Sequence, residues 1–142
     1  NSMIEKNPNS KNGYYMKGCV LLNLQKDFPA SRECFEKAIA LDDQFVESYI
    51  NIGVSYINEV ISRRNKGEYC TDRTKVKQYN ADIEKMKVFY KKALPYFEKA
   101  RELKPDDIKL WAANLQNVYS NLGMKDKANE MDQLLQQVAN QK

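Results

Sequence analysis

The chain has 142 residues, of which 42% are hydrophobic and 30% are charged, and its formal net charge is +4. This length suits one domain with a buried core, and five glycines with four prolines supply few turn residues for an all-β fold. Histidine is absent and the three cysteines do not have metal-ligand spacing, which excludes Ser-His-Asp and Cys-His nucleophiles and most zinc sites. The odd cysteine count favours free thiols, with a Cys19–Cys34 disulfide as the alternative.

Residues 1–10 are polar and lack the basic-then-apolar layout of a signal peptide. We interpret them as the tail of a preceding repeat or as an expression remnant. No run of 18 apolar residues occurs, so we expect no transmembrane helix, and the cellular compartment stays open.

Residues 11–45 predict a first pair of helices. Tyr14, Gly18 and Leu21 share one helical face at spacings of four and three, so a small residue lies between two large ones. The small residue lets the partner helix approach closely. That partner helix carries Phe-Glu-Lys-Ala at residues 35–38, and Pro29 falls in its first turn, where proline is tolerated.

Residues 46–105 repeat this pattern as a second pair. Tyr49, Gly53 and Tyr56 reproduce the large-small-large face, and residues 97–100 reproduce the Phe-Glu-Lys-Ala segment. The interval from Asp43 to Pro105 is 62 residues, which is 28 more than a 34-residue period.

We place this insertion at about residues 60–88, between the two helices of the second pair. The first helix should stop near residues 65–67, and a polar stretch should follow at 68–75. A long second helix is then predicted from apolar residues that recur every three or four positions: Val76, Tyr79, Ile83, Met86, Tyr90, Ala93, Phe97 and Ala100. Both helices should project as a hairpin past the edge of the fold, with a kink at Pro95.

The segment 61–92 carries ten Lys or Arg against four Asp or Glu. Arg63, Arg64 and Lys66 form a candidate basic patch for an acidic protein face, a nucleic-acid backbone or anionic lipid. The alternative is a solvated hairpin that uses charge to stay soluble. Nucleic acid is disfavoured, because no base-stacking or groove-reading motif accompanies the charge.

Residues 106–142 form the third unit. Trp111, Leu115 and Tyr119 lie on one face, and a Leu-Gly turn at 122–123 leads to the last helix. Gln116 stands where a small residue is expected. A loosely matching last unit is typical of a solenoid cap, whose outer face meets water.

Together these segments resemble the tetratricopeptide repeat, of the kind found in bacterial proteins. The resemblance implies an all-α fold, a right-handed α-solenoid of about three helix pairs with the second pair extended by the inserted hairpin. It also implies a concave groove, lined by the first helix of each pair, that takes a peptide or a helix. Carried onto this chain, the groove residues are Tyr15, Cys19, Leu22, Ile50, Asn51, Val54, Ile57, Asn114 and Asn117. The carboxylate clamp of some family members is disfavoured, because Tyr15 and Cys19 stand where it needs Lys and Asn.

We therefore expect a non-catalytic scaffold that binds a protein or peptide, without a metal or a cofactor. The carboxylates cluster at turns and on exposed helix faces, and no Gly-rich phosphate loop is present, so an enzyme is not expected. The alternatives are a regulatory or substrate-presenting segment of a larger enzyme, and a homo-oligomeric self-association module.

Overall fold

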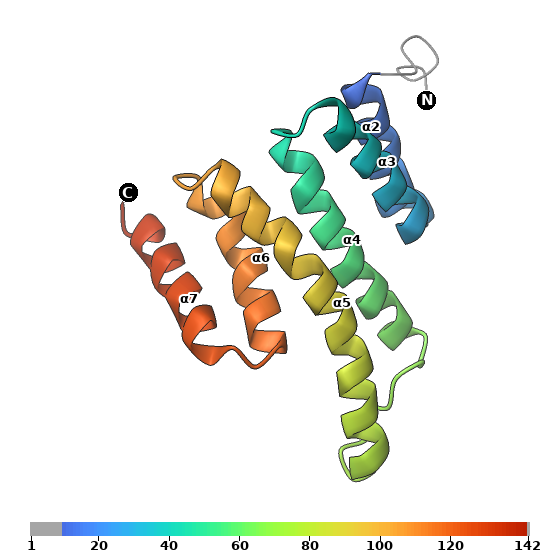
Figure 1. Ribbon diagram of the computed structural model, residues 1–142. Helices are drawn as coiled ribbons and strands as arrows, with labels where there is room; N and C mark the ends of the chain where they lie inside the picture. The colour runs from blue at the N-terminus through green and yellow to red at the C-terminus, as the bar shows by residue number, and fades with distance from the viewer. Residues whose placement is uncertain (1–9, 142) are drawn as a thin grey trace.

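The computed structural model describes residues 10–141, and the regular structure in that range is entirely helical (Figure 1). Residues 1–9 lie outside the described range, so the interpretation of residues 1–10 as a repeat tail is untested. The elements in chain order are α2 (Lys11–Val20), η1 (Leu21–Gln25), α3 (Phe28–Leu41), α4 (Val46–Asn65), α5 (Val76–Leu103), α6 (Ile108–Asn121) and α7 (Lys125–Ala139).

Each helix packs on the next one along the chain, so that α2 pairs with α3, α4 with α5 and α6 with α7 (Figure 1). Short turns separate most of the helices, which makes sequential neighbours antiparallel. The stacked pairs are consistent with the predicted all-α solenoid.

The first helix contains a feature that the sequence analysis missed. Five residues at its end, Leu21–Gln25, form a π-helix, which terminates at Lys26 in the left-handed conformation (φ 55°). A π-turn accommodates one extra residue in a helix without breaking it. Asp27 then caps α3 by accepting a hydrogen bond from the Ala30 N–H (3.2 Å), and Pro29 lies in the first turn as predicted.

In each of the first two helix pairs, a glycine allows the two helices to pack closely. A Cβ atom on Gly18 would lie 2.7 Å from Cε1 of Phe35, and one on Gly53 would lie 2.5 Å from Cζ of Phe97. Each glycine of the predicted large-small-large face therefore receives the phenylalanine of the Phe-Glu-Lys-Ala segment. The two pairs are built on the same contact.

The second pair is longer than the others. Helix α4 has 20 residues and α5 has 28, and a loop over residues 66–75 joins them. Their joined ends extend beyond the neighbouring pairs (Figure 1). The long helix starts at Val76 as predicted. The Val76 side chain is 61% exposed, since the recurring apolar residues of α5 are fully buried only from Tyr90 onward. Helix α5 runs through Pro95 without interruption, and a kink there stays a prediction.

The buried side chains form two clusters. One cluster joins α4, α5, α6 and α7 around Phe97, Trp111 and Leu115, and the other joins α2, α3 and α4 around Phe35 and Ile52. Val54 and Tyr56 pack against both clusters, which makes α4 the element shared between the two halves of the core.

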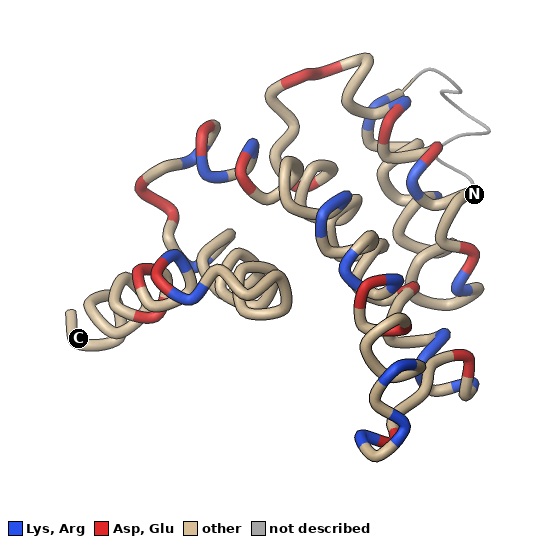
Figure 2. The backbone as a smooth tube through the Cα atoms, turned by 60° about the horizontal axis from the view of Figure 1, so that its bottom comes forward, with Lys and Arg blue, Asp and Glu red and all other residues tan. Residues whose placement is uncertain are grey.

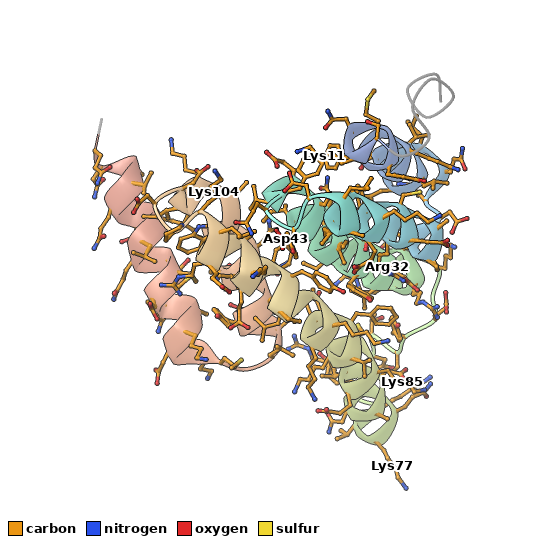
Figure 3. All side chains as sticks on the ribbon, turned by 45° about the horizontal axis from the view of Figure 1, so that its top comes forward. Lys11, Arg32, Asp43, Lys77, Lys85 and Lys104 are labelled. Carbon is orange, nitrogen blue, oxygen red and sulfur yellow. The ribbon has the colours of Figure 1, made fainter. Side chains whose placement is uncertain are left out.

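Arg32 connects α3 to α4 across the boundary between the first two pairs (Figure 3). Its guanidinium donates to the Ser55 hydroxyl (3.2 Å) and to Glu59 Oε1 (2.8 Å). The same group lies 4.1 Å from the ring centroid of Tyr56. Since the Arg32 and Glu59 side chains are only 16% and 12% exposed, this ion pair is a structural contact rather than a surface one.

Candidate partner-binding surfaces

Three of the predicted groove residues meet where α2 faces α4. The side-chain amide of Asn51 donates a hydrogen bond to the Tyr15 hydroxyl (2.9 Å) and lies 3.8 Å from Cys19 Sγ. The structure thus brings Tyr15, Cys19 and Asn51 together, although they come from two helix pairs. Each keeps part of its side chain exposed.

The Tyr15 side chain is held on several sides. Its ring packs against Phe35 and Phe45, with centroid distances of 5.7 Å and 5.0 Å. Burial, together with the neighbouring Cys19, raises the pKa of the Tyr15 hydroxyl to about 12. Burial likewise raises the pKa of the Cys19 thiol. Both groups are therefore neutral near pH 7 and present a polar but uncharged surface.

Helix α4 supplies four of the predicted groove residues. Asn51 belongs to the contact with Tyr15, and the other three, Ile50, Val54 and Ile57, differ in burial. Ile50 and Val54 are partly buried against the core and keep some exposed surface. Ile57 is 6% exposed, and so is a core residue. Leu22 of the first pair is also a core residue, at 2% exposed. The prediction that Leu22 and Ile57 contact a partner is therefore wrong, because both side chains are consumed by packing between helices.

Helix α6 carries the remaining predicted groove residues, Asn114 and Asn117, and both are partly exposed. Asn117 accepts two hydrogen bonds from the Asn121 amide, one at its backbone carbonyl (2.8 Å) and one at Oδ1 (2.9 Å). This local bonding orders the end of α6. It leaves the Asn117 amide nitrogen available as a donor to a ligand.

The predicted basic patch does not form one surface. Arg63 is neutralised by Glu59 (3.2 Å) and Glu68 (3.3 Å), and these contacts help to raise the pKa of its guanidinium. Arg64 lines a cavity next to α5 and α6, whereas Arg63 and Lys66 together line a different hollow beside Phe28. Arg64 is thus separated from Arg63 and Lys66, because successive residues at a helix end point in different directions.

A family model described as tetratricopeptide repeat matches residues 12–45, which covers nearly all of α2 and α3. Residues 12–45 are thus similar to a tetratricopeptide repeat. The chain is also 38% identical over 47 residues to protein O-mannosyl-transferase TMTC3 of Mus musculus. That alignment covers 33% of this chain and 5% of the other protein, so the chain spans a small part of that relative's length.

Tetratricopeptide repeats generally mediate protein–protein interactions and are generally non-catalytic. Over residues 10–141, no group of three or more Cys, Asp or Glu side chains is arranged to hold a metal ion. Within the same range, no helix is long and apolar enough to cross a membrane.

The first helix pair has an exposed apolar stripe along α2 and η1 that the sequence did not reveal. Met16, Val20 and Leu24 are 46%, 38% and 78% exposed. They follow one another at spacings of four along α2 and η1, so they share one face. The sequence shows their hydrophobicity and spacing. It does not show that Met16 and Val20 face outward while Tyr15 and Cys19, one residue earlier in each case, are partly buried.

The equivalence of Gly18 and Gly53 shows what this stripe corresponds to in the next pair. Met16 lies two residues before its glycine, as Asn51 does, and Val20 lies two residues after, as Ser55 does. In α4 these positions contact the preceding pair, through Tyr15 and through Arg32. The α2 stripe therefore occupies the face by which one helix pair stacks on another.

Proposed function

We propose that this chain is a protein-interaction module whose partner, a peptide or a helix, lies along the face formed by α2, α4 and α6. The observation that carries the proposal is the partial exposure of predicted groove residues on three successive first helices. The residues that keep exposed surface are Tyr15, Cys19, Ile50, Asn51, Val54, Asn114 and Asn117.

The chemistry of this face favours a partner with an apolar anchor and exposed backbone groups. Tyr15, Ile50 and Val54 supply apolar surface, which suits one side of an amphipathic helix or a single large side chain. Asn114 and Asn117 supply amides that both donate and accept hydrogen bonds, so they can bind backbone groups without selecting a sequence.

A capture experiment with charge-matched variants tests the proposal. The purified chain is used to recover partners from a lysate of the source cells, beside an Asn114→Arg/Asn117→Arg variant on α6. The control is Gln133→Arg/Gln137→Arg, which adds the same charge to exposed positions of α7. Substitutions at Ile50 or Val54 are avoided, because these side chains also pack against the core and their loss would destabilise the fold.

The proposal predicts a partner that binds the native chain and the α7 control but not the α6 variant. Retention of the same partner by the α6 variant would move the binding site elsewhere. Loss from both variants would show that added charge alone prevents binding.

A second candidate function is self-association, and the exposed α2 stripe favours it. Apolar side chains at a stacking face tend to be covered by another helix, which a second copy can supply. Val20→Lys/Leu24→Lys should then convert a concentration-dependent oligomer into a monomer in light-scattering measurements. A native chain that remains monomeric up to millimolar concentration would exclude this function.

A third candidate, a regulatory or substrate-presenting segment of a larger enzyme, is motivated by the name of the mouse relative. That protein is called an O-mannosyl-transferase, and the segment shared with it is a small part of its length. Activity is not carried over to this chain. Capture of a glycosyltransferase domain, or of its substrate, by the same face would favour this role.

A further inference from the structure

The projecting end of the second helix pair contains a cavity of about 320 Å³. It lies between α5, the loop over residues 66–75 and the end of α6. We call it the hairpin pocket, and its lining includes Arg64, Cys70, Arg73, Ile83, Met86 and Tyr90. None of these residues belongs to the face proposed above for the groove partner.

The loop wall of the hairpin pocket is fixed by two aspartates. Asp82, which is 5% exposed, accepts a hydrogen bond from the Cys70 N–H (2.8 Å) and pairs with Lys85 (3.4 Å). Asp72 accepts from the Thr74 N–H (2.9 Å), which closes a turn inside the loop. The pocket is thus pre-formed, and a ligand would not have to order this wall.

The rim of the pocket is cationic. Arg64, Arg73 and Lys87 line it and none of the lining residues is a carboxylate, although Lys87 pairs with Glu84 (3.3 Å). Among the described residues, Arg64 and Arg73 form no ion pair with a carboxylate, in contrast to Arg63 between Glu59 and Glu68. Figure 2 shows Lys and Arg along the same projecting end of the hairpin. Two free guanidinium groups at one opening favour a ligand that carries carboxylates.

The floor of the pocket is apolar. Ile83 and Met86 are partly buried, and the Tyr90 ring beside them is 8% exposed. This floor suits an aliphatic or aromatic side chain, which a pocket of this size can bury. A nucleic-acid backbone fits less well, because its affinity accumulates over a longer track of cations than three side chains provide.

We propose that the hairpin pocket binds an acidic peptide segment of a partner protein. An apolar side chain of the peptide packs on Ile83 and Met86, and flanking carboxylates pair with Arg64 and Arg73. This site is separate from the groove and does not depend on it, so the two surfaces can hold two segments of one partner or two different partners.

The test uses an array of hexapeptides in which four positions are Asp or Glu and two are Leu, Phe, Met or Tyr, in all arrangements. The strongest binder is labelled and titrated with the purified full chain by fluorescence anisotropy. The pocket variant is Arg64→Glu/Arg73→Glu, and the control is Lys75→Glu/Lys77→Glu, which makes the same charge change on exposed positions of the same hairpin. Circular dichroism confirms that both variants are folded.

The expected result is a peptide that the native chain binds, with affinity lowered about 10-fold or more by the pocket variant and less than about 3-fold by the control. Replacing the peptide's apolar residues with Ser should also weaken binding, because the floor would lose its contact. Equal losses in both variants, or an array without any binder, would overturn the proposal. A thymidine oligonucleotide that binds more tightly than the peptide, and loses affinity in the pocket variant, would also overturn it.

Discussion

The backbone of Gly53 packs directly against the ring of Phe97, so closely that a Cβ atom would lie 2.5 Å from Cζ. Gly18 and Phe35 make the same contact in the first pair, at 2.7 Å from Cε1. Because the contact joins the two helices of each pair, it sets the distance between them. The rest of each pair's packing depends on that distance.

Gly53→Ala is therefore expected to lower the free energy of unfolding by about 1–3 kcal/mol, the usual cost of overpacking a core. In an unconstrained helix the same change would stabilise by about 1 kcal/mol, because alanine has the higher helix propensity. Urea unfolding of the native and variant chains measures the difference. Adding Phe97→Leu should recover part of the loss, and a stabilised Gly53→Ala chain would contradict the close packing.

Glu59→Gln should destabilise the fold by about 1–3 kcal/mol, because Arg32 would lose its charged partner in a largely buried position. The matched change Glu68→Gln should have an effect within about 0.5 kcal/mol, since Glu68 is 45% exposed. Thermal or urea unfolding of both variants makes the comparison. Equal effects would show that the contact between α3 and α4 does not stabilise the stack.

The sequence predicted the helices and their pairing, because the large-small-large faces and the Phe-Glu-Lys-Ala segments record contacts within each pair. The start of the long helix at Val76 also followed from periodicity. The π-helix at Leu21–Gln25 could not be predicted in this way, because its residues are ordinary helix formers.

Asp82 should make the order of the hairpin loop depend on pH. Its hydrogen bond from the Cys70 N–H, with the nearby Lys85, holds the pKa of Asp82 below the ordinary aspartate value. The stabilisation is therefore fully present above the ordinary pKa of about 3.9 and is lost as the pH falls through the lowered folded value. Hydrogen exchange should show a protected Cys70 amide at pH 7 that loses protection in strong acid.

An Asp82→Asn variant supplies the control for this pH effect. It should show weak protection of the Cys70 amide already at pH 7, because the neutral amide is a poorer acceptor than the carboxylate. Its protection should also no longer depend on protonation at this position. Full protection of the Cys70 amide in the variant would mean that the loop is held by other contacts.

The Cys19 and Cys34 thiols of the first helix pair should react slowly. Burial raises the pKa of Cys34, which is 7% exposed, and burial also raises the pKa of Cys19, so little thiolate forms at either. Alkylation by iodoacetamide at pH 7.5, followed by mass spectrometry, should label both more slowly than a free cysteine peptide. In denaturant the rates should rise to the peptide value, and rapid labelling of the native chain would contradict the burial.

The candidate site was less predictable than the fold. Tyr15, Cys19 and Asn51 meet in the structure although Asn51 is equivalent to Met16, so their contact depends on how the two helix pairs stack. Leu22 and Ile57 were misplaced, because an apolar residue at a groove position and one at a core position look alike in a single sequence. The separation of Arg64 from Lys66 depends on the direction in which α4 ends, which charge counting does not reveal.

Partner binding along α2, α4 and α6 is tested most directly by amide chemical shifts of the ¹⁵N-labelled chain, titrated with the partner segment that the native chain captures. The predicted result is a contiguous set of shifts that includes Tyr15, Asn51, Asn114 and Asn117. Shifts confined to α7, or to the projecting ends of α4 and α5, would contradict binding along this face.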